Sequence, residues 1–163
     1  MVDYPRFIVD CVLGHIAKKL RIMGFDTEFG LDAGDDFLID KSMNEQKLLV
    51  TRDVGLYLKL SKSGRNGLLL HNDYEVENLV FILKSCDIKH IDPVPNVNTR
   101  CTICNGTLTK IDKTMATSLI PEKIYKHIST VYKCSKYSKI YWDGTHVENI
   151  NMLLDNINNL LGQ

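Results

Sequence analysis

Residues 6–26 read RFIVDCVLGHIAKKLRIMGFD, and this stretch indicates how the first half of the chain folds. The apolar run Phe7-Ile8-Val9 has the length of a strand and ends in an acid, Asp10. From Val12 onward the apolar residues recur at helical spacing, and Gly24 follows as a helix terminator. The pattern predicts a short buried strand and then an amphipathic helix.

The same alternation continues to about residue 91. Further strands are expected at 27–29, 47–51 and 67–70, with helices that begin at Asp35, at Val54 and near Val76. Strands that alternate with helices form a parallel sheet with helices on both faces. We therefore predict an α/β domain over residues 1–92.

The pattern changes after the segment Asp92-Pro93-Val94-Pro95-Asn96, whose two prolines suit a linker. Residues 97–146 contain three of the five cysteines and are expected to form a small separate module. Residues 147–163 carry apolar residues along one face and predict a C-terminal amphipathic helix. This helix is expected to pack onto its own domain, with a homodimer contact as the alternative.

Composition sets the broad class of the protein. The chain has 163 residues, with 20 basic and 20 acidic side chains and 44% hydrophobic residues, which excludes disordered and collagen-like classes. No apolar run reaches the roughly 18 residues that cross a bilayer, and residues 1–5 lack the layout of a secretory signal. We expect a cytoplasmic protein with no membrane partner.

Carboxylates gather where the predicted strands end. Asp10, Asp53 and Asp73 follow strands, whereas Asp35 and Asp36 open the helix after the second strand. Ligands of open parallel sheets bind outside the carboxyl ends of the strands. Converging carboxylates repel one another without a cation, and oxygen ligands favour Mg²⁺ or Mn²⁺. The arrangement predicts metal-assisted phosphodiester hydrolysis.

Each acid also has an ordinary structural interpretation. Asp35, Asp53 and Asp73 suit helix N-caps, and Asp36 suits the first turn of a helix, where the dipole favours negative charge. Asp10 is harder to explain in this way, because an acid at the end of a buried strand needs a partner or a metal.

Basic residues on the first helix suggest an RNA-binding surface. Lys18, Lys19 and Arg21 are expected to lie away from the apolar stripe and to contact backbone phosphates, together with Arg52. The alternative is that they form the solvated face of an amphipathic helix. Because the net charge is zero, any RNA binding must come from such local patches and should weaken with salt.

The cysteines indicate a metal site that lacks one ligand. Cys101 and Cys104 form a C-x-x-C knuckle, and Cys134 stands where a third zinc ligand belongs. The position of the fourth thiolate is occupied by Tyr137. His146 is the candidate that would complete a Cys₃His site.

Two alternatives stay open for this module. His127 could supply the fourth ligand in place of His146, although neither has the expected spacing. Otherwise the zinc site is vestigial and a small apolar cluster holds the module together.

Several ordered blocks together resemble one family. They are FIVD at 7–10, LG at 13–14, Asp35 with Leu38, LLVTRD at 48–53, ND at 72–73, RCTICNG at 100–106 and IYWDGTH at 140–146. This series resembles the Mut-seven C-terminal RNase domain, a PIN-like ribonuclease family that is usually followed by a zinc ribbon. The resemblance covers about residues 6–150.

The resemblance implies a PIN-like three-layer sandwich with a parallel central sheet, followed by a zinc-ribbon-like module and a C-terminal helix. It implies an acidic cleft that holds Mg²⁺ or Mn²⁺ and cleaves RNA. By position, Asp10 and Asp53 would coordinate the metal and Asp35 would position a metal-bound water. Asp73 and Asp36 match as additional acids.

Two other functions remain open. The first is an RNA-binding or ribosome-associated protein whose acidic cleft no longer cleaves, and it fits a ribbon that has lost one ligand. The second is a toxin-like PIN protein that is silenced by a small partner. Cleavage that requires Mg²⁺ or Mn²⁺ would separate the nuclease from the silent binder.

Overall fold

A computed structural model describes residues 4–31 and 33–163, and its first part is built on a parallel sheet. The four strands are β1 (Phe7–Val9), β2 (Thr27–Phe29), β3 (Leu48–Thr51) and β4 (Leu68–Leu69). They pair in the order β2-β1-β3-β4, and every pair is parallel. The parallel sheet predicted from the alternating pattern is confirmed.

Helices connect these strands, as parallel pairing requires. The connecting helices are α1 (Gly14–Ile22), α2 (Asp35–Asn44) and α3 (Val54–Lys62), and a 3₁₀ turn at Cys11–Leu13 precedes α1. A further helix, α4 (Glu75–Ser85), follows β4. Gly24 follows α1 with a φ of 102°, a backbone conformation that glycine adopts without steric cost. A Cβ at that position would lie 2.7 Å from the side chain of Asn98, so the site also needs the small residue.

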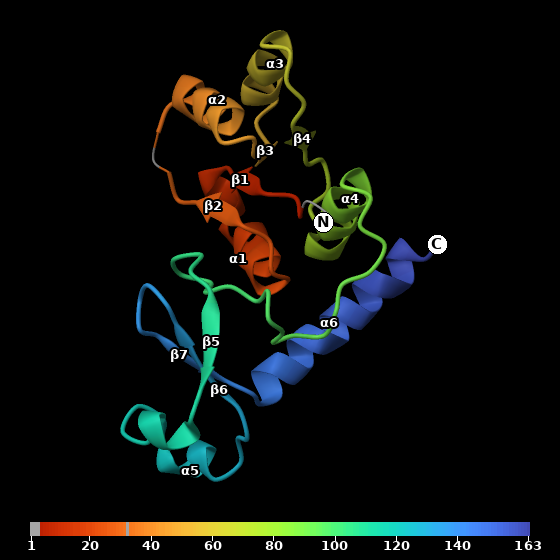
Figure 1. The fold of residues 1–163 in the computed structure, drawn as a ribbon. Coiled ribbons are helices and arrows are strands. Elements are labelled where there is room, and N and C mark those ends of the chain that lie inside the picture. Colours follow the sequence, from red (N-terminus) through yellow and green to blue (C-terminus); the bar gives the residue numbers. More distant parts are fainter. Residues whose placement is uncertain (1–3, 32) are drawn as a thin grey trace.

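Alternate residues of the central strands pack on opposite faces of the sheet. Phe7, Val9 and Val50 join α1 and α4 in the larger core, whereas Ile8 and Leu49 join α2 and α3 in the smaller one. The strands are buried on both faces, which explains why they read as continuous apolar runs rather than as an alternating pattern. Helices therefore cover both sides of the sheet (Figure 1).

The C-terminal helix α6 (Thr145–Leu161) completes the larger core. Its apolar stripe contributes four buried side chains to that cluster, and it contacts α4. Burying each such side chain is worth about 1.5–3 kcal/mol. As expected, this helix packs within its own chain. Although residues 147–163 lie outside the predicted domain of residues 1–92, α6 packs against that domain.

The linker is held against α6 by two asparagines. The side-chain amide of Asn151 donates to the carbonyl of Val94 and accepts from its N–H, both at 2.8 Å. Asn158 makes the same pair of bonds to Ile91, both at 2.9 Å. Because the two asparagines are seven residues apart, they lie on one face of the helix and fix the linker along it.

A small antiparallel sheet follows the linker, beyond the C-terminal end of α1 (Figure 1). It contains β5 (Leu108–Ile111), β6 (Val131–Cys134) and β7 (Ile140–Trp142) in the order β5-β6-β7. A 3₁₀ turn at Lys113–Ala116 and the short helix α5 (Glu122–Tyr125) connect β5 to β6. Its own core is small, with Ala116, Ile120, Ile128 and Val131 as the buried members.

Arg21 joins the two sheets, and its expected position on the exposed face of the first helix is wrong. Its side chain is only 4% exposed. The guanidinium donates to the carbonyl of Thr27 at 2.8 Å and to those of Thr102 and Ile103 at 2.9 and 3.1 Å. The physical reason lies in the helical spacing, because Arg21 follows Ala17 by four residues and so shares the apolar face of α1. Arg21 is a structural residue.

Among residues 4–31 and 33–163, no helix combines the length and the apolar character that a bilayer crossing requires.

Candidate functional site

The carboxyl edge of the parallel sheet carries the acids Asp10, Asp35, Asp36, Asp53 and Asp73, here called the acidic edge. Asp10 follows β1 directly, and its Oδ2 accepts a hydrogen bond from the Thr51 hydroxyl at 2.7 Å. The same hydroxyl oxygen accepts from the backbone N–H of Asp53 at 2.9 Å. Thr51 is 1% exposed, so this hydroxyl is a fixed link between the ends of β1 and β3.

Asp53 caps α3, as one of its two interpretations predicts. Its Oδ1 accepts from the N–H groups of Gly55 and Leu56 at 2.6 and 3.1 Å. These bonds satisfy two of the unpaired N–H groups at the helix start. The cap fixes the direction of the carboxylate while the residue stays exposed.

Lysine 59 of α3 neutralises another part of the acidic edge. Its Nζ lies 2.7 Å from Oδ2 of Asp35, at the start of α2. This hydrogen bond raises the pKa of Lys59, and the charges of Asp36 and Asp53 raise it further. Lys59 therefore pairs with Asp35 and also feels the charges of Asp36 and Asp53. Its position in the sequence does not signal this, because the contact joins two different helices.

Asp73, after β4, has a basic partner of its own. Its Oδ1 lies 2.6 Å from Nη2 of Arg52, which also donates to the carbonyl of Asn72 at 3.1 Å. The carboxylate is 89% exposed, so the pair is a surface ion pair of small energy. Arg52, expected to contact RNA, is engaged by Asp73 in this structure.

The acids do not form a preassembled three-ligand site. Within the part of the chain that the structure describes, the acidic edge has no three ligand atoms that all lie within 4.8 Å of one another. Mg²⁺ commonly keeps several waters and binds only one or two carboxylates directly. The donor chemistry of the edge suits such an ion, and the spacing suits one or two direct ligands rather than three.

The two lysines of α1 differ in their surroundings. Lys18 is exposed on the middle of the helix. Lys19 lies 3.0 Å from Glu75 of α4, a contact that links the two helices. Of the basic residues that α1 was expected to offer to RNA, Lys18 is the one that keeps an open position.

Three thiols meet at one end of the antiparallel sheet. The Sγ atoms of Cys101, Cys104 and Cys134, here called the thiol cluster, lie within 4.8 Å of one another, and those of Cys104 and Cys134 are 3.3 Å apart. Thiolates bound to one tetrahedral zinc ion lie ~3.8 Å apart. The three cysteines that the sequence grouped are therefore brought together.

Backbone groups surround the thiol cluster as a metal knuckle requires. The N–H groups of Lys136 and Tyr137 point to Sγ of Cys134, at 3.4 and 3.3 Å. A Cβ on Gly106 would lie 3.1 Å from that sulfur and 3.3 Å from that of Cys104, so only glycine fits there without displacement. The N–H donors can satisfy the sulfur of a metal-bound cysteine, and the close approach at Gly106 lets the loop fold tightly around the three sulfurs.

The thiols differ in acidity because their surroundings differ. Burial tends to raise the pKa of Cys101, but hydrogen bonds from the Tyr141 hydroxyl and from backbone N–H groups outweigh it and lower the pKa to about 7. Burial raises the pKa of Cys104. Burial also raises the pKa of Tyr141, to about 12, so its hydroxyl keeps its proton.

The fourth position of the thiol cluster is not taken by the expected histidine. Among the described residues, the group that meets the 4.8 Å spacing contains the three cysteines alone, so neither His146 nor His127 belongs to it. Tyr137 is 64% exposed. The group beside the cluster is the hydroxyl of Tyr141, 3.0 Å from Sγ of Cys101. The pairing of β6 with β7 places Tyr141 there, and no spacing in the sequence signals it.

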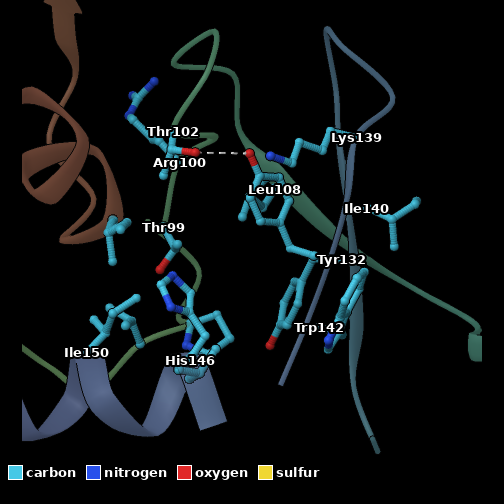
Figure 2. A pocket seen from close by; sticks show the side chains of 15 residues that line it. Thr99, Arg100, Thr102, Leu108, Tyr132, Lys139, Ile140, Trp142, His146 and Ile150 are labelled. Atoms are coloured by element: carbon cyan, nitrogen blue, oxygen red, sulfur yellow. Dashed lines mark hydrogen bonds between the residues drawn. The ribbon is translucent and has the colours of Figure 1, made fainter. Parts of the chain in front are cut away.

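A cavity of about 410 Å³ lies between the antiparallel sheet, the linker and α6 (Figure 2). Aromatic side chains of β6 and β7 form one wall, whereas Ile22 and Ile150 belong to the other. Figure 2 shows Lys139 reaching in from the sheet and His146 from the start of α6. We call this space the aromatic cavity. Sequence reasoning did not identify it, because its walls come from segments that lie far apart in the sequence.

The comparisons with known proteins assign the chain to a family. The model of the Mut7-C RNAse domain matches residues 5–154, which include both sheets, the acidic edge and the thiol cluster. The comparisons with curated proteins and with solved structures gave no match. The match confirms the family that the sequence blocks resemble and indicates a ribonuclease-type function with RNA as substrate. The chain belongs to the Mut7-C RNAse domain family.

Proposed function

We propose that this protein is a metal-dependent ribonuclease of PIN-like architecture that hydrolyses RNA phosphodiester bonds at the acidic edge. The observation that carries the proposal is the Thr51 hydroxyl, which joins the side chain of Asp10 to the backbone of Asp53 through bonds of 2.7 and 2.9 Å. A buried hydroxyl that ties two strand ends together holds both acids in fixed relation. Such positioning is what a catalytic site needs and a helix cap alone does not.

The remaining contacts suggest a role for each acid. Asp53 uses Oδ1 for the cap of α3, so Oδ2 would be its ligand atom. Asp10 has a second oxygen, Oδ1, beyond the one that Thr51 binds. Asp10 and Asp53 would hold Mg²⁺ or Mn²⁺, and a bound metal supplies an activated water and stabilises the charge that develops on the phosphate. Asp35 would orient water beside them, with Lys59 as its counterion.

The thiol cluster supports a structural zinc ion. Three thiolates, two N–H donors on Cys134 and the tight approach at Gly106 fit the ligand chemistry of zinc. Cys101, Cys104 and Cys134 would hold the ion, with the fourth position left to a ligand outside this trio. The ion would fix the knuckle loop that Arg21 binds through the carbonyls of Thr102 and Ile103.

One observation favours the second candidate, a silent RNA-binding or ribosome-associated protein. Lys59 already pairs with Asp35, and Arg52 with Asp73, so two of the five acids have protein cations as partners. A cleft whose charges are balanced internally has less need of a metal. In this case the protein would bind RNA without cleaving it.

Cleavage of a mixed RNA pool across a series of Mg²⁺ and Mn²⁺ concentrations tests the proposal. Asp10→Asn keeps the size of the side chain but removes its charge. Changing a residue that only orients a metal ligand lowers activity by about 10- to 100-fold. Loss of a ligand itself should cost more, so we expect the cleavage rate to fall by more than about 100-fold. Asp155→Asn on the exposed face of α6 is the matched control and should cleave normally. Full activity of Asp10→Asn contradicts the assigned site, and RNA binding without cleavage in the unmodified protein favours the silent binder.

A further inference from the structure

The aromatic cavity has the properties of a ligand site rather than of a gap between elements. Its volume of about 410 Å³ lies in the range of small-molecule pockets. It is separate from the acidic edge, because Ile22 at the C-terminal end of α1 lines it whereas Asp10 precedes that helix. The nine residues of α1 span ~13 Å between the two places.

The charge of the cavity selects an anion. Of the described residues that line it, three are basic (Arg100, Lys139 and His146) and none is acidic. The guanidinium of Arg100 donates to the carbonyls of Gly24 and Asn105 at 3.3 and 3.0 Å, and Figure 2 shows this side chain directed away from Tyr132 and Trp142. Lys139 and His146 are therefore the basic side chains that an entering group would meet. Lys139 is exposed, and its Nζ lies 5.2 Å from the ring centroid of Tyr141. A negative group entering the cavity would therefore meet Lys139 at the opening.

The walls select a flat aromatic group. Tyr132, Tyr141 and Trp142 come from the two paired strands β6 and β7, and Figure 2 shows the ring of Tyr132 and that of His146 turned toward the interior. Thr99 and Thr102 line the linker side. The Thr99 hydroxyl accepts from the N–H of Asn96 at 2.9 Å, and the Thr102 hydroxyl lies 3.4 Å from that of Tyr141. A hydroxyl has one donor and two acceptor positions, so each keeps capacity for a further hydrogen bond to the edge of a base. A nucleotide combines these features: a negative phosphate, a flat aromatic base and polar groups along the edge of that base.

We propose that the aromatic cavity binds one unpaired nucleotide of an RNA strand, with its base against Tyr132 and Trp142 and its phosphate at Lys139. The proposal rests on the proposed function in one respect, that the ligand belongs to RNA. The nucleotide would anchor the strand at one end of α1, and the strand would pass the exposed Lys18 toward the acidic edge. Stacking on aromatic rings tolerates every base, so the anchor would hold single-stranded RNA with little sequence preference.

Trp142 makes a direct test available, because it is the single tryptophan of the chain. Its fluorescence is followed while a short single-stranded RNA is added to the full-length protein carrying Asp10→Asn, which prevents cleavage. We expect a saturable change. A second titration with free nucleoside monophosphates separates the sources of the ligand: a weak response supports the RNA strand, whereas tight saturation by mononucleotides overturns that assignment in favour of a free nucleotide.

Matched variants identify the contacts. Tyr132→Leu should weaken RNA binding by about 5- to 150-fold, the loss of one stacked base. Lys139→Ala should reduce the salt dependence by about 0.7 in the slope of log K against log salt, the value of one phosphate on a single strand. The controls are Lys133→Ala, which lies next to Tyr132 on β6 outside the cavity, and the exposed Tyr137→Leu. Both should bind RNA normally.

The proposal and the nuclease activity can fail separately. If Tyr132→Leu and Lys139→Ala both bind RNA as the unmodified protein does, the anchor is wrong even where cleavage is observed. If the Trp142 response and the variant effects are present but no metal supports cleavage, the anchor stands and the nuclease assignment fails. A response to an acidic peptide and not to RNA would show that the ligand class is wrong.

Discussion

The acidic edge and the thiol cluster are both sets of potential metal ligands, but they are organised differently. The thiols come from two turns of one small sheet, and their three sulfurs lie within 4.8 Å of one another with backbone donors around them. The acids come from the ends of separate strands and helices, and most have a local partner. The thiol cluster is preassembled, whereas the acidic edge is held in parts that a ligand would have to draw together.

Because of this difference, we expect the thiol cluster to contribute to stability and the acidic edge to contribute to activity. A preassembled ligand set contributes its binding free energy to folding. A set of acids with alternative partners contributes little to folding and can respond to metal and substrate. Changes at the thiol cluster should therefore affect stability most, and changes at the acidic edge should affect activity with little loss of stability.

The largest expected effect follows from Cys104→Ser. Serine cannot replace a zinc thiolate, and structural zinc binding is worth about 10–16 kcal/mol in small zinc modules. We expect Cys104→Ser to bind none of the zinc that we propose for the cluster, and its antiparallel sheet to unfold before the parallel one, as followed by metal analysis and by Trp142 fluorescence. Cys11→Ser, outside the cluster, is the control and should keep its zinc. Wild-type protein that holds no zinc and is as stable as Cys104→Ser would mean that the site is vestigial.

Arg21→Met should have the next largest effect, because it acts where the two regions join. The change keeps the apolar stem but leaves the carbonyls of Thr27, Thr102 and Ile103 without their donor. A buried acceptor without a partner costs about 1–3 kcal/mol, so we expect a loss of roughly 3 kcal/mol in the free energy of unfolding. Chemical denaturation measures it.

Lys18→Met is the matched control for Arg21→Met, since it removes a charge from the exposed face of the same helix. It should leave stability nearly unchanged. A weaker affinity for RNA with unchanged stability in Arg21→Met would instead restore the phosphate-binding role that its burial argues against.

The sequence predicts local elements better than it predicts contacts between them. The boundaries of β1 and β2 and the start of α2 follow from short apolar runs and from acids in a first helical turn, which are properties of neighbouring residues. The expected capping roles of Asp35 and Asp73 are wrong, because Gly34 and Tyr74 occupy the N-cap positions of α2 and α4. The burial of Arg21 and the pair of Lys59 with Asp35 depend on which helices pack together. The same holds for the site, where the cysteine spacing predicts the thiol cluster but not the Tyr141 hydroxyl beside it.

Thr51→Val should lower activity without a comparable loss of stability. Valine has the same shape and the same preference for strands, but it lacks the hydroxyl that joins Asp10 to Asp53. Groups that orient metal ligands contribute about 10- to 100-fold to activity, whereas the lost hydrogen bonds cost about 1 kcal/mol in stability. Metal-dependent cleavage and thermal unfolding should be measured on the same samples. Thr51→Ser keeps the hydroxyl and should restore activity; equal activity of all three proteins would mean that the link has no catalytic role.

The smallest effect is expected from Tyr141→Phe, and it concerns the acidity of one thiol in metal-free protein. Removing the hydroxyl takes away one of the hydrogen bonds that lower the pKa of Cys101 to about 7. This pKa should therefore rise, but the backbone N–H groups should keep it below its ordinary value.

Since the pKa of Cys101 is lower in the folded state, the contribution of this thiol to stability is present above its ordinary pKa of 9.0 and is lost as the pH falls through about 7. The raised pKa of Cys104 acts only at higher pH and does not mask this window. Metal-free Tyr141→Phe should therefore show a weaker gain of stability between pH 7 and 9 than the unmodified protein, and its thiolate absorbance should appear at higher pH. The acidic edge does not share this contact, so Tyr141→Phe should leave Mg²⁺-dependent cleavage at fixed pH unchanged. If cleavage changes as well, the thiol cluster and the acidic edge are coupled although they lie on different sheets.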